Sequence, residues 1–212
     1  MSETTALIGL AALWLAYAAL HSLLAANAVK AAITRRWPGA AGAYRLAYNA
    51  LAGLLLLPPL ALLYGRAWTP LWTWPGLWAW VSHGLGLLAI LGFWLSSRHY
   101  DMADFLGFKA STVKAGFCLS PWHCHVRHPW YALGLLLIWS RPMDSGFLLT
   151  ACVLTLYFVI GSRLEEQKLI AQYGEVYRAY CQRVPGLVPL PWRRLRADEA
   201  AALIAQAQRP EC

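Results

Sequence analysis

The chain has 212 residues, of which 59% are hydrophobic and only 13% charged, and its mean hydropathy is +0.44. This composition excludes a soluble domain with a wetted surface, so we expect an integral membrane protein. The formal charge of +8 could indicate nucleic-acid binding. However, the basic residues are grouped between apolar segments, as in loops beside an anionic leaflet, so we expect membrane lipid and no nucleic acid as a partner.

Three apolar runs in the first half of the chain predict membrane-spanning helices. Residues 6–29 are followed by a lysine and are long enough to cross a hydrocarbon core of about 30 Å. Because no basic residue precedes this run, it is expected to remain as a span and not to be removed as a signal peptide. The second and third predicted spans are Tyr48–Tyr64 and Gly76–Ser97.

Two further apolar runs predict the end of the membrane bundle. Residues 130–140 form a short run that Pro142 stops, and Gly146–Gly161 form a longer one. The predicted fold is therefore an all-α integral membrane protein of five transmembrane helices, with the last two as a helical hairpin. A cytoplasmic C-terminal helix is expected to follow.

Basic residues set the predicted orientation. They gather after the first span, before the fourth and beyond the fifth, whereas the opposite loops hold only Arg66 and Arg141. Because cytoplasmic loops carry the excess of Lys and Arg, we expect the N-terminus outside and the C-terminus in the cytoplasm.

Two polar motifs stand out from the apolar background, and both are expected at the cytoplasmic boundary. One is Arg-His-Pro-Trp-Tyr at residues 127–131, and the other is the pair Glu165-Glu166. Charges beside lipid are costly unless they bind a ligand or each other, so function is expected here. Helical spacing puts Glu166 on the face of Leu169, Tyr173, Tyr177 and Tyr180, with Glu165 turned about 100° away.

The expected partner of Glu166 is Arg127, and two interpretations of the pair remain open. It could form part of a site for a zwitterionic ligand, or it could be a structural ion pair that ties the C-terminal helix to the bundle.

Histidines and a cysteine outside these motifs raise the question of metal or haem. Imidazole and thiolate are metal ligands, but histidines two residues apart point in different directions on a strand or a helix, which does not suit joint chelation. We therefore predict no metal site and leave the roles open. The residues concerned are His21, His83, His123, Cys124 and His125.

The segment from Val126 to Pro189 carries a resemblance. It contains RHPWY, then Pro-Met in the loop, then LYFVIGSRLEEQKLIAQYGEVYRAYCQRVPGLVP. It resembles the cofactor region of the isoprenylcysteine carboxyl methyltransferase superfamily, and within it the small bacterial methanethiol S-methyltransferase type. More weakly, HSLLA at residues 21–25 and YRLAYN at 44–49 also resemble this branch. Residues 120–126 depart from the family pattern, in which a glycine and a tyrosine often precede the motif.

The resemblance implies an S-adenosylmethionine-dependent membrane methyltransferase that acts on a small or lipophilic thiol. It implies one domain over residues 1–192, with the cofactor region at 120–190 and a cytoplasmic tail at 193–212. Cofactor-binding residues carried over from the family motifs are Arg127, His128, Tyr131, Glu165 and Glu166, and Arg127 and Glu166 are also the predicted catalytic residues. The alternative is a haem-binding membrane isomerase or redox protein related to zeta-carotene isomerase. The sequence does not indicate an oligomeric state or the methyl acceptor.

Overall fold

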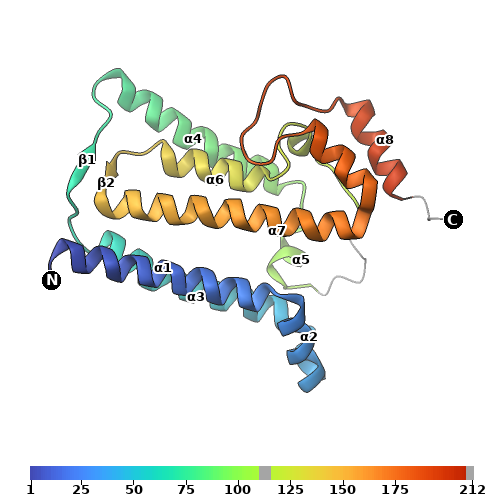
Figure 1. The fold of residues 1–212 in the computed structure, drawn as a ribbon, viewed down its shortest axis with the longest axis horizontal. Helices are drawn as coiled ribbons and strands as arrows, with labels where there is room; N and C mark the ends of the chain where they lie inside the picture. Colours follow the sequence, from blue (N-terminus) through green and yellow to red (C-terminus); the bar gives the residue numbers. More distant parts are fainter. Residues whose placement is uncertain (110–115, 209–212) are drawn as a thin grey trace. The chain divides into compact units, whose positions relative to one another are not determined.

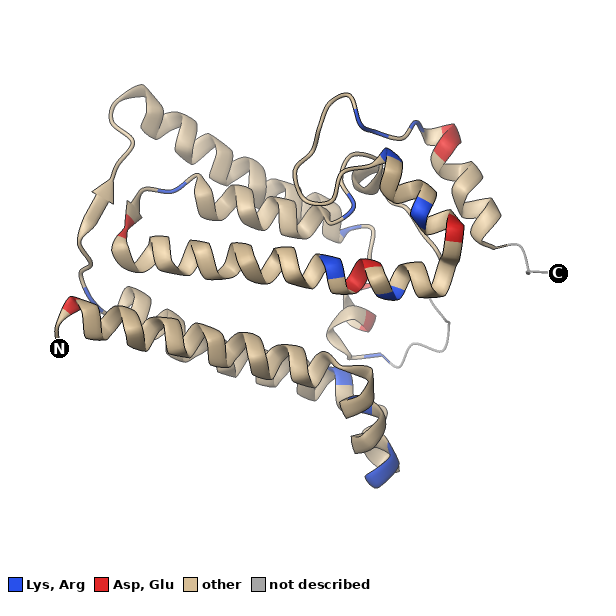
Figure 2. Ribbon diagram, viewed as in Figure 1, with Lys and Arg blue, Asp and Glu red and all other residues tan. Residues whose placement is uncertain are grey.

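The computed structural model describes residues 1–109 and 116–208, which are mostly helical (Figure 1). Four helices in this part of the chain are long and apolar enough to cross a membrane. Figure 2 shows that charged residues are nearly absent from these helices until the second half of the last one. The four are α1 (Glu3–Ala25), α3 (Tyr44–Tyr64), α4 (Leu77–Ser97) and α7 (Ser145–Arg183).

The helix at the predicted fourth span is shorter than these four. It is α6 (Pro129–Trp139), which has 11 residues. At a rise of 1.5 Å per residue, it extends over about 17 Å, roughly half of a hydrocarbon core.

The chain divides into two compact units, each built from segments that are distant in sequence. Unit 1 comprises residues 1–75, 100–112 and 142–154, and unit 2 comprises residues 76–99, 113–141 and 155–212. The long helix α7 begins in unit 1 and continues in unit 2.

Unit 1 is built on α1 and α3, which lie side by side (Figure 1). Helix α1 ends at Ala25, whereas the sequence predicted one continuous run to residue 29. Ala26 is extended, and the Tyr44 hydroxyl donates a hydrogen bond of 2.6 Å to the carbonyl of Leu24. The chain therefore turns into a separate helix. This unit also contains α2 (Asn27–Arg36), the 3-10 helix η1 (Pro38–Ala40) and α5 (Met102–Leu106).

A two-stranded sheet in unit 1 departs from the predicted all-α fold. Strands β1 (Pro70–Trp72) and β2 (Met143–Asp144) pair antiparallel. Beside the sheet, the carboxylate of Glu3 accepts hydrogen bonds from Thr69 and from Ser145. Extended loop segments thus satisfy their backbone groups by pairing with each other, which helical periodicity does not reveal.

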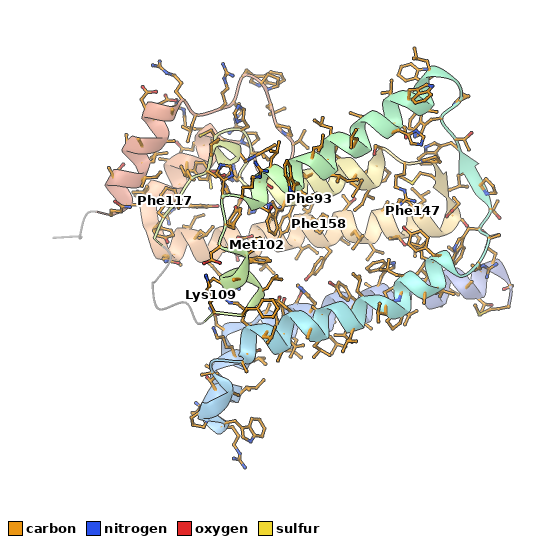
Figure 3. The ribbon with its side chains drawn as sticks, turned by 180° about the vertical axis from the view of Figure 1, so that it is seen from behind. Phe93, Met102, Lys109, Phe117, Phe147 and Phe158 are labelled. Atoms are coloured by element: carbon orange, nitrogen blue, oxygen red, sulfur yellow. The ribbon has the colours of Figure 1, made fainter. Side chains whose placement is uncertain are left out.

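Unit 2 packs α4, α6 and the later part of α7 closely. A Cβ atom built on Gly92 of α4 would lie 2.6 Å from the Cδ2 atom of Leu133 of α6, so the two helices approach closely here and a larger residue would require the Leu133 side chain to shift. Gly134 of α6 in turn lies against Phe93 of α4 and Phe158 of α7, which are labelled in Figure 3.

Helix α7 has 39 residues and carries both the apolar run and the polar segment with the two glutamates. The sequence predicted a separate C-terminal helix after residue 161, but nothing between Gly161 and Gly174 breaks the helix. The interruption comes at Gly174, where φ is 55° and ψ is −131°. This left-handed conformation favours glycine, and the chain bends here before the last helical turns.

The C-terminal part of unit 2 forms a small core with the end of α7. Its buried residues are Phe117, Tyr177, Tyr180, Val184, Leu195 and Ala200. Helix α8 (Ala197–Ala207) contributes to this core, although the sequence assigned residues 193–212 to a tail. The Leu195 amide donates to the carbonyl of Cys124 at 2.9 Å, which joins this segment to η2 (Pro121–Cys124).

Candidate active site

Arg127 and Glu166 form an ion pair in unit 2. The Arg127 Nε atom donates to the Glu166 Oε1 atom at 2.8 Å, and both side chains are largely buried. The contact predicted from the cost of a charge on a packed helical face is therefore present. A pair that is shielded from water contributes little net stability while it is intact, but loss of one partner leaves an uncompensated buried charge.

Arg127 also caps the end of α7. Its Nη1 atom donates to the carbonyl oxygens of Cys181, at 3.0 Å, and Val184. The final carbonyls of a helix have no partner within the helix, so a guanidinium group placed there satisfies them.

The backbone adds a second connection between the same segments. The amide of Arg127 donates to the carbonyl of Pro185 at 2.8 Å, and that of His128 to the carbonyl of Gly186 at 3.1 Å. Gly186 lies against the ion pair, since a Cβ atom there would be 3.3 Å from the Arg127 Nη2 atom. Sequence reasoning missed Gly186, although a glycine after Val184-Pro185 was a local signal of close backbone approach.

His128 bridges the two glutamates. Its Nε2 atom lies 2.9 Å from the Glu166 Oε1 atom, and its Nδ1 atom lies 3.4 Å from the Glu165 Oε2 atom. Burial opposes the charged imidazolium, but hydrogen bonds to Glu165 and Glu166 and their negative charges outweigh it, so the pKa of His128 is raised. A protonated ring can donate to both carboxylates at once.

Tyr131 supports this imidazole ring. The rings of His128 and Tyr131 are stacked with centroids 5.5 Å apart, and Tyr131 stacks on Phe158 of α7 at 5.0 Å. Tyr131, one helical turn after His128, therefore fixes the orientation of the His128 imidazole ring.

A cavity of about 290 Å³ opens beside the cluster. Of the predicted site residues, Arg127, His128 and Glu165 line it. Glu166 and Tyr131 are not among the described residues that do. Helical phase favoured Glu166 for the tyrosine face, yet Glu165 is the carboxylate at the cavity and its side chain is 52% exposed. The bend at Gly174 changes the phase between Tyr173 and Tyr177, which simple periodicity does not anticipate.

Aromatic rings form a second wall of this cavity. The Phe117 ring has its centroid 5.2 Å from that of Tyr173, 6.2 Å from that of Tyr177 and 6.1 Å from that of Tyr180 (Figure 3 labels Phe117). All four residues line the cavity. Aromatic faces attract organic cations, so the cavity combines a carboxylate with surfaces that suit positive charge. The sequence analysis had not singled out Phe117.

A second cavity, of about 510 Å³, lies on the other side of the same segment and is almost entirely apolar. Val126 and Pro129 line this apolar cavity. Arg127 and His128, which lie between these two residues in the sequence, line the first cavity. Its other lining residues are Pro121, Trp122, His125, Ala132, Leu133, Leu136 and Pro189.

The remaining histidines and Cys124 are dispersed. His21 lies 2.8 Å from the Tyr48 hydroxyl in unit 1, and the Nδ1 atom of His83 bonds to the carbonyl of Ala79 on its own helix. His123 belongs to the wall of the charged cavity, and His125 to that of the apolar one. Within residues 1–109 and 116–208, no three His, Cys, Asp or Glu side chains are grouped so that they could hold a metal ion.

Several curated proteins are similar to this chain. Methanethiol S-methyltransferase 2 of Bradyrhizobium diazoefficiens is 33% identical over 196 residues, which cover 86% of this chain and 73% of the relative. The methanethiol S-methyltransferase of a Pseudomonas species is 37% identical over 155 residues, covering 66% and 57%. That of Pseudomonas deceptionensis is 34% identical over 115 residues, covering 50% and 42%. No protein-family model and no solved structure matches the chain.

Apolar helices that can cross a membrane, and a cavity lined by charged and aromatic side chains, define a helical membrane protein with a ligand-sized polar site. The chain belongs to the methanethiol S-methyltransferase family of the isoprenylcysteine carboxyl methyltransferase-like group, and it is a methyltransferase.

Proposed function

We propose that the protein transfers the methyl group of S-adenosylmethionine to a thiol such as methanethiol, at the charged cavity of unit 2. The observation that carries this proposal is the juxtaposition of the exposed Glu165 carboxylate with Arg127, His128 and an aromatic wall. A sulfonium and an amine suit the carboxylate and the rings, and a carboxylate suits the cationic groups. The side chains present therefore fit this methyl donor.

The bound methyl donor would supply an electrophilic methyl carbon beside a sulfonium leaving group. The residues of the chain need to orient the two reactants and exclude water, because displacement at carbon requires alignment. We assign Glu165 and His128 to contact with the methyl donor. Arg127 and Glu166 hold this arrangement, since the guanidinium also ties the end of α7 to the segment before α6.

The apolar cavity on the far side of residues 126–129 is the proposed approach for the thiol. Its lining suits an acceptor that partitions into lipid. The thiol would react as its thiolate, with its proton released to bulk water, and the positive charges of a bound donor and of His128 would favour that thiolate.

The membrane arrangement is part of the same proposal. We assign α6 as a fourth, short span between α4 and α7, which gives five spans with α6 and α7 as a hairpin. The N-terminus is then outside and the charged cavity at the cytoplasmic side, consistent with the basic residues that follow the first, third and fifth spans. Labelling of single cysteines introduced at Arg66 and Arg194 in intact cells, expected only at position 66, tests this orientation.

Purified protein with methyl-labelled S-adenosylmethionine and methanethiol tests the reaction. Labelled dimethyl sulfide is the expected product. Glu165→Gln should reduce binding of the methyl donor about tenfold or more, because a charge-assisted contact is lost. Glu175→Gln is the matched control, since Glu175 is exposed and forms an ion pair with Arg178 one turn away. No labelled product from the wild-type protein would contradict the proposal.

A further inference from the structure

His123 lies in the wall of the charged cavity and has a fixed ring. Its Nδ1 atom accepts a hydrogen bond from the backbone amide of Ser120 at 3.3 Å, and the Ser120 hydroxyl lies 2.8 Å from the same atom. The carbonyl of His123 accepts a hydrogen bond of 2.8 Å from the Tyr180 hydroxyl. The residue is thus held by its own 3-10 helix and by the end of α7.

These contacts determine where the ring carries its proton. A backbone amide can only donate, so Nδ1 must offer its lone pair, and a neutral imidazole then carries its hydrogen on Nε2. Burial, with the positive charges of His128 and His99, outweighs the opposing charge of Glu165 and lowers the pKa of His123 to about 4. The ring is therefore neutral near pH 7, and its outer nitrogen is a hydrogen-bond donor and not a base.

The donor end of the His123 ring is accessible and has no partner among the described residues. None of the described residues forms a hydrogen bond or ion pair with the Nε2 atom of His123. Among the same residues, no buried polar side-chain atom lacks a partner. The Nε2 atom consequently lies at an accessible surface, and His123 is one of the residues that line the charged cavity.

The charges around this cavity indicate which ligand group the donor meets. The exposed carboxylate of Glu165 comes from α7, whereas the Nε2–H donor of His123 and the cationic His128 come from the segment before α6. A zwitterionic amino acid group would direct its amine to the first and its carboxylate to the second. An N–H group also forms a stronger hydrogen bond with a carboxylate than with an uncharged acceptor, because the bond to the carboxylate is charge-assisted.

We propose that the Nε2–H group of His123 binds the carboxylate of the methyl donor's amino acid moiety, which makes His123 a further binding residue of this site. The inference rests on the proposed use of S-adenosylmethionine. It gives a role to His123, which the sequence alone left open.

The test compares two ligands that differ only in this carboxylate, S-adenosylmethionine and its decarboxylated analogue. Their affinities are measured by calorimetry on the purified full-length protein. His123→Ala should weaken binding of S-adenosylmethionine about tenfold or more and leave that of the analogue within about twofold. His123→Gln, which keeps an N–H donor but cannot act as a base, should restore most of the lost affinity.

His125→Ala is the matched control, because His125 lies at the end of the same 3-10 helix and lines the other cavity. Equal weakening of both ligands by His123→Ala, or of neither, would overturn the assignment. Nitrogen-15 NMR of the ligand-free wild-type protein gives a readout independent of any variant's folding. The Nε2-protonated tautomer is expected, and a proton on Nδ1 would also overturn it.

The outcomes separate this inference from the proposed function. If the wild-type protein binds neither ligand, the use of S-adenosylmethionine is wrong and the role of His123 fails with it. If the wild-type protein binds S-adenosylmethionine and His123→Ala binds it equally well, only the role of His123 is wrong.

Discussion

Arg127 and Glu166 are 39 residues apart in sequence, yet the Nε and Oε1 atoms of their side chains lie 2.8 Å apart. Because the same guanidinium group also satisfies the last carbonyls of α7, this one contact joins the start of α6 to both the middle and the end of α7. Four predictions test this connection, the residues beside it and the apolar cavity.

Loss of the Glu166 carboxylate should destabilise the protein. Glu166→Gln leaves the Arg127 charge without its counterion in a largely buried position, at an expected cost of about 3 kcal/mol. Thermal unfolding in detergent measures it, with Glu175→Gln as a control expected to stay within about 0.5 kcal/mol. Equal melting temperatures for the two variants would show that the pair contributes nothing to stability.

A methyl group at Gly186 should disturb the site without breaking a helix. The added Cβ atom would lie 3.3 Å from the Arg127 Nη2 atom and 3.7 Å from the Glu166 Oε1 atom. Arg127 is held by several hydrogen bonds and has little freedom to move away, so Gly186→Ala should cost about 1–2 kcal/mol.

Gly53→Ala is the control for the change at Gly186. It lies inside α3 and has nothing within 4 Å of the added atom. Alanine is the better helix former, so this variant should be neutral or slightly stabilising. Denaturation midpoints compare the two, and a Gly186→Ala midpoint at or above that of Gly53→Ala would contradict the close approach.

His128 should make stability depend on pH in the neutral to alkaline range. Its pKa is raised in the folded protein because the two glutamates outweigh burial. Its contribution is therefore complete below the unfolded pKa of about 6.5 and is lost as pH rises through the folded value. Lowering the pH from 9 to 6.5 should raise the melting temperature of the wild-type protein by about 2–4 °C relative to His128→Gln.

The pH window for this measurement avoids His123. The pKa of His123 is lowered to about 4 in the folded protein, so folding favours the neutral ring. Protonation of His123 therefore destabilises the folded protein only below about pH 6.5. If the melting temperatures of the wild type and of His128→Gln change equally between pH 6.5 and pH 9, the pKa of His128 is not raised in the folded protein.

The apolar cavity should limit the size of the thiol. Ala132 lines it, and Ala132→Phe would fill part of its roughly 510 Å³. Methyl transfer to hexanethiol should then fall about tenfold or more relative to methanethiol, because the longer chain needs the occupied space. Leu135→Phe, on the same helix but outside the lining, is the control. An unchanged ratio of the two rates in Ala132→Phe would remove this cavity from the acceptor path.

The sequence predicted the parts of the fold that depend on composition and length. Apolar runs identified α3 and α4 to within a few residues, because crossing a membrane requires about 20 apolar residues. The cost of a charge beside packed residues similarly led from Glu166 to Arg127. Both inferences need only local pattern and elementary energetics.

The parts that were missed depend on where the backbone turns. Helix α7 continues past Gly161 and bends at Gly174, and Glu165 lines the cavity together with Leu169 and Tyr173 from the part of the helix before the bend. Ala26 ends α1 early, in a position where alanine gives no helix-ending signal. The role of His123 likewise depends on a 3-10 turn whose hydrogen bonds are visible only in the folded chain.

The hydrogen bonds of Arg127 to Cys181, Val184 and Pro185 also bear on biosynthesis. All of its partners are translated at least 39 residues after it, so no counterion exists when the helices before it enter the bilayer. In the proposed orientation, Arg127 is a free positive charge during insertion and can help to retain its loop on the cytoplasmic side. The same side chain thus has two successive tasks, first in topogenesis and then, once the C-terminal segment has emerged from the ribosome, in closing the site.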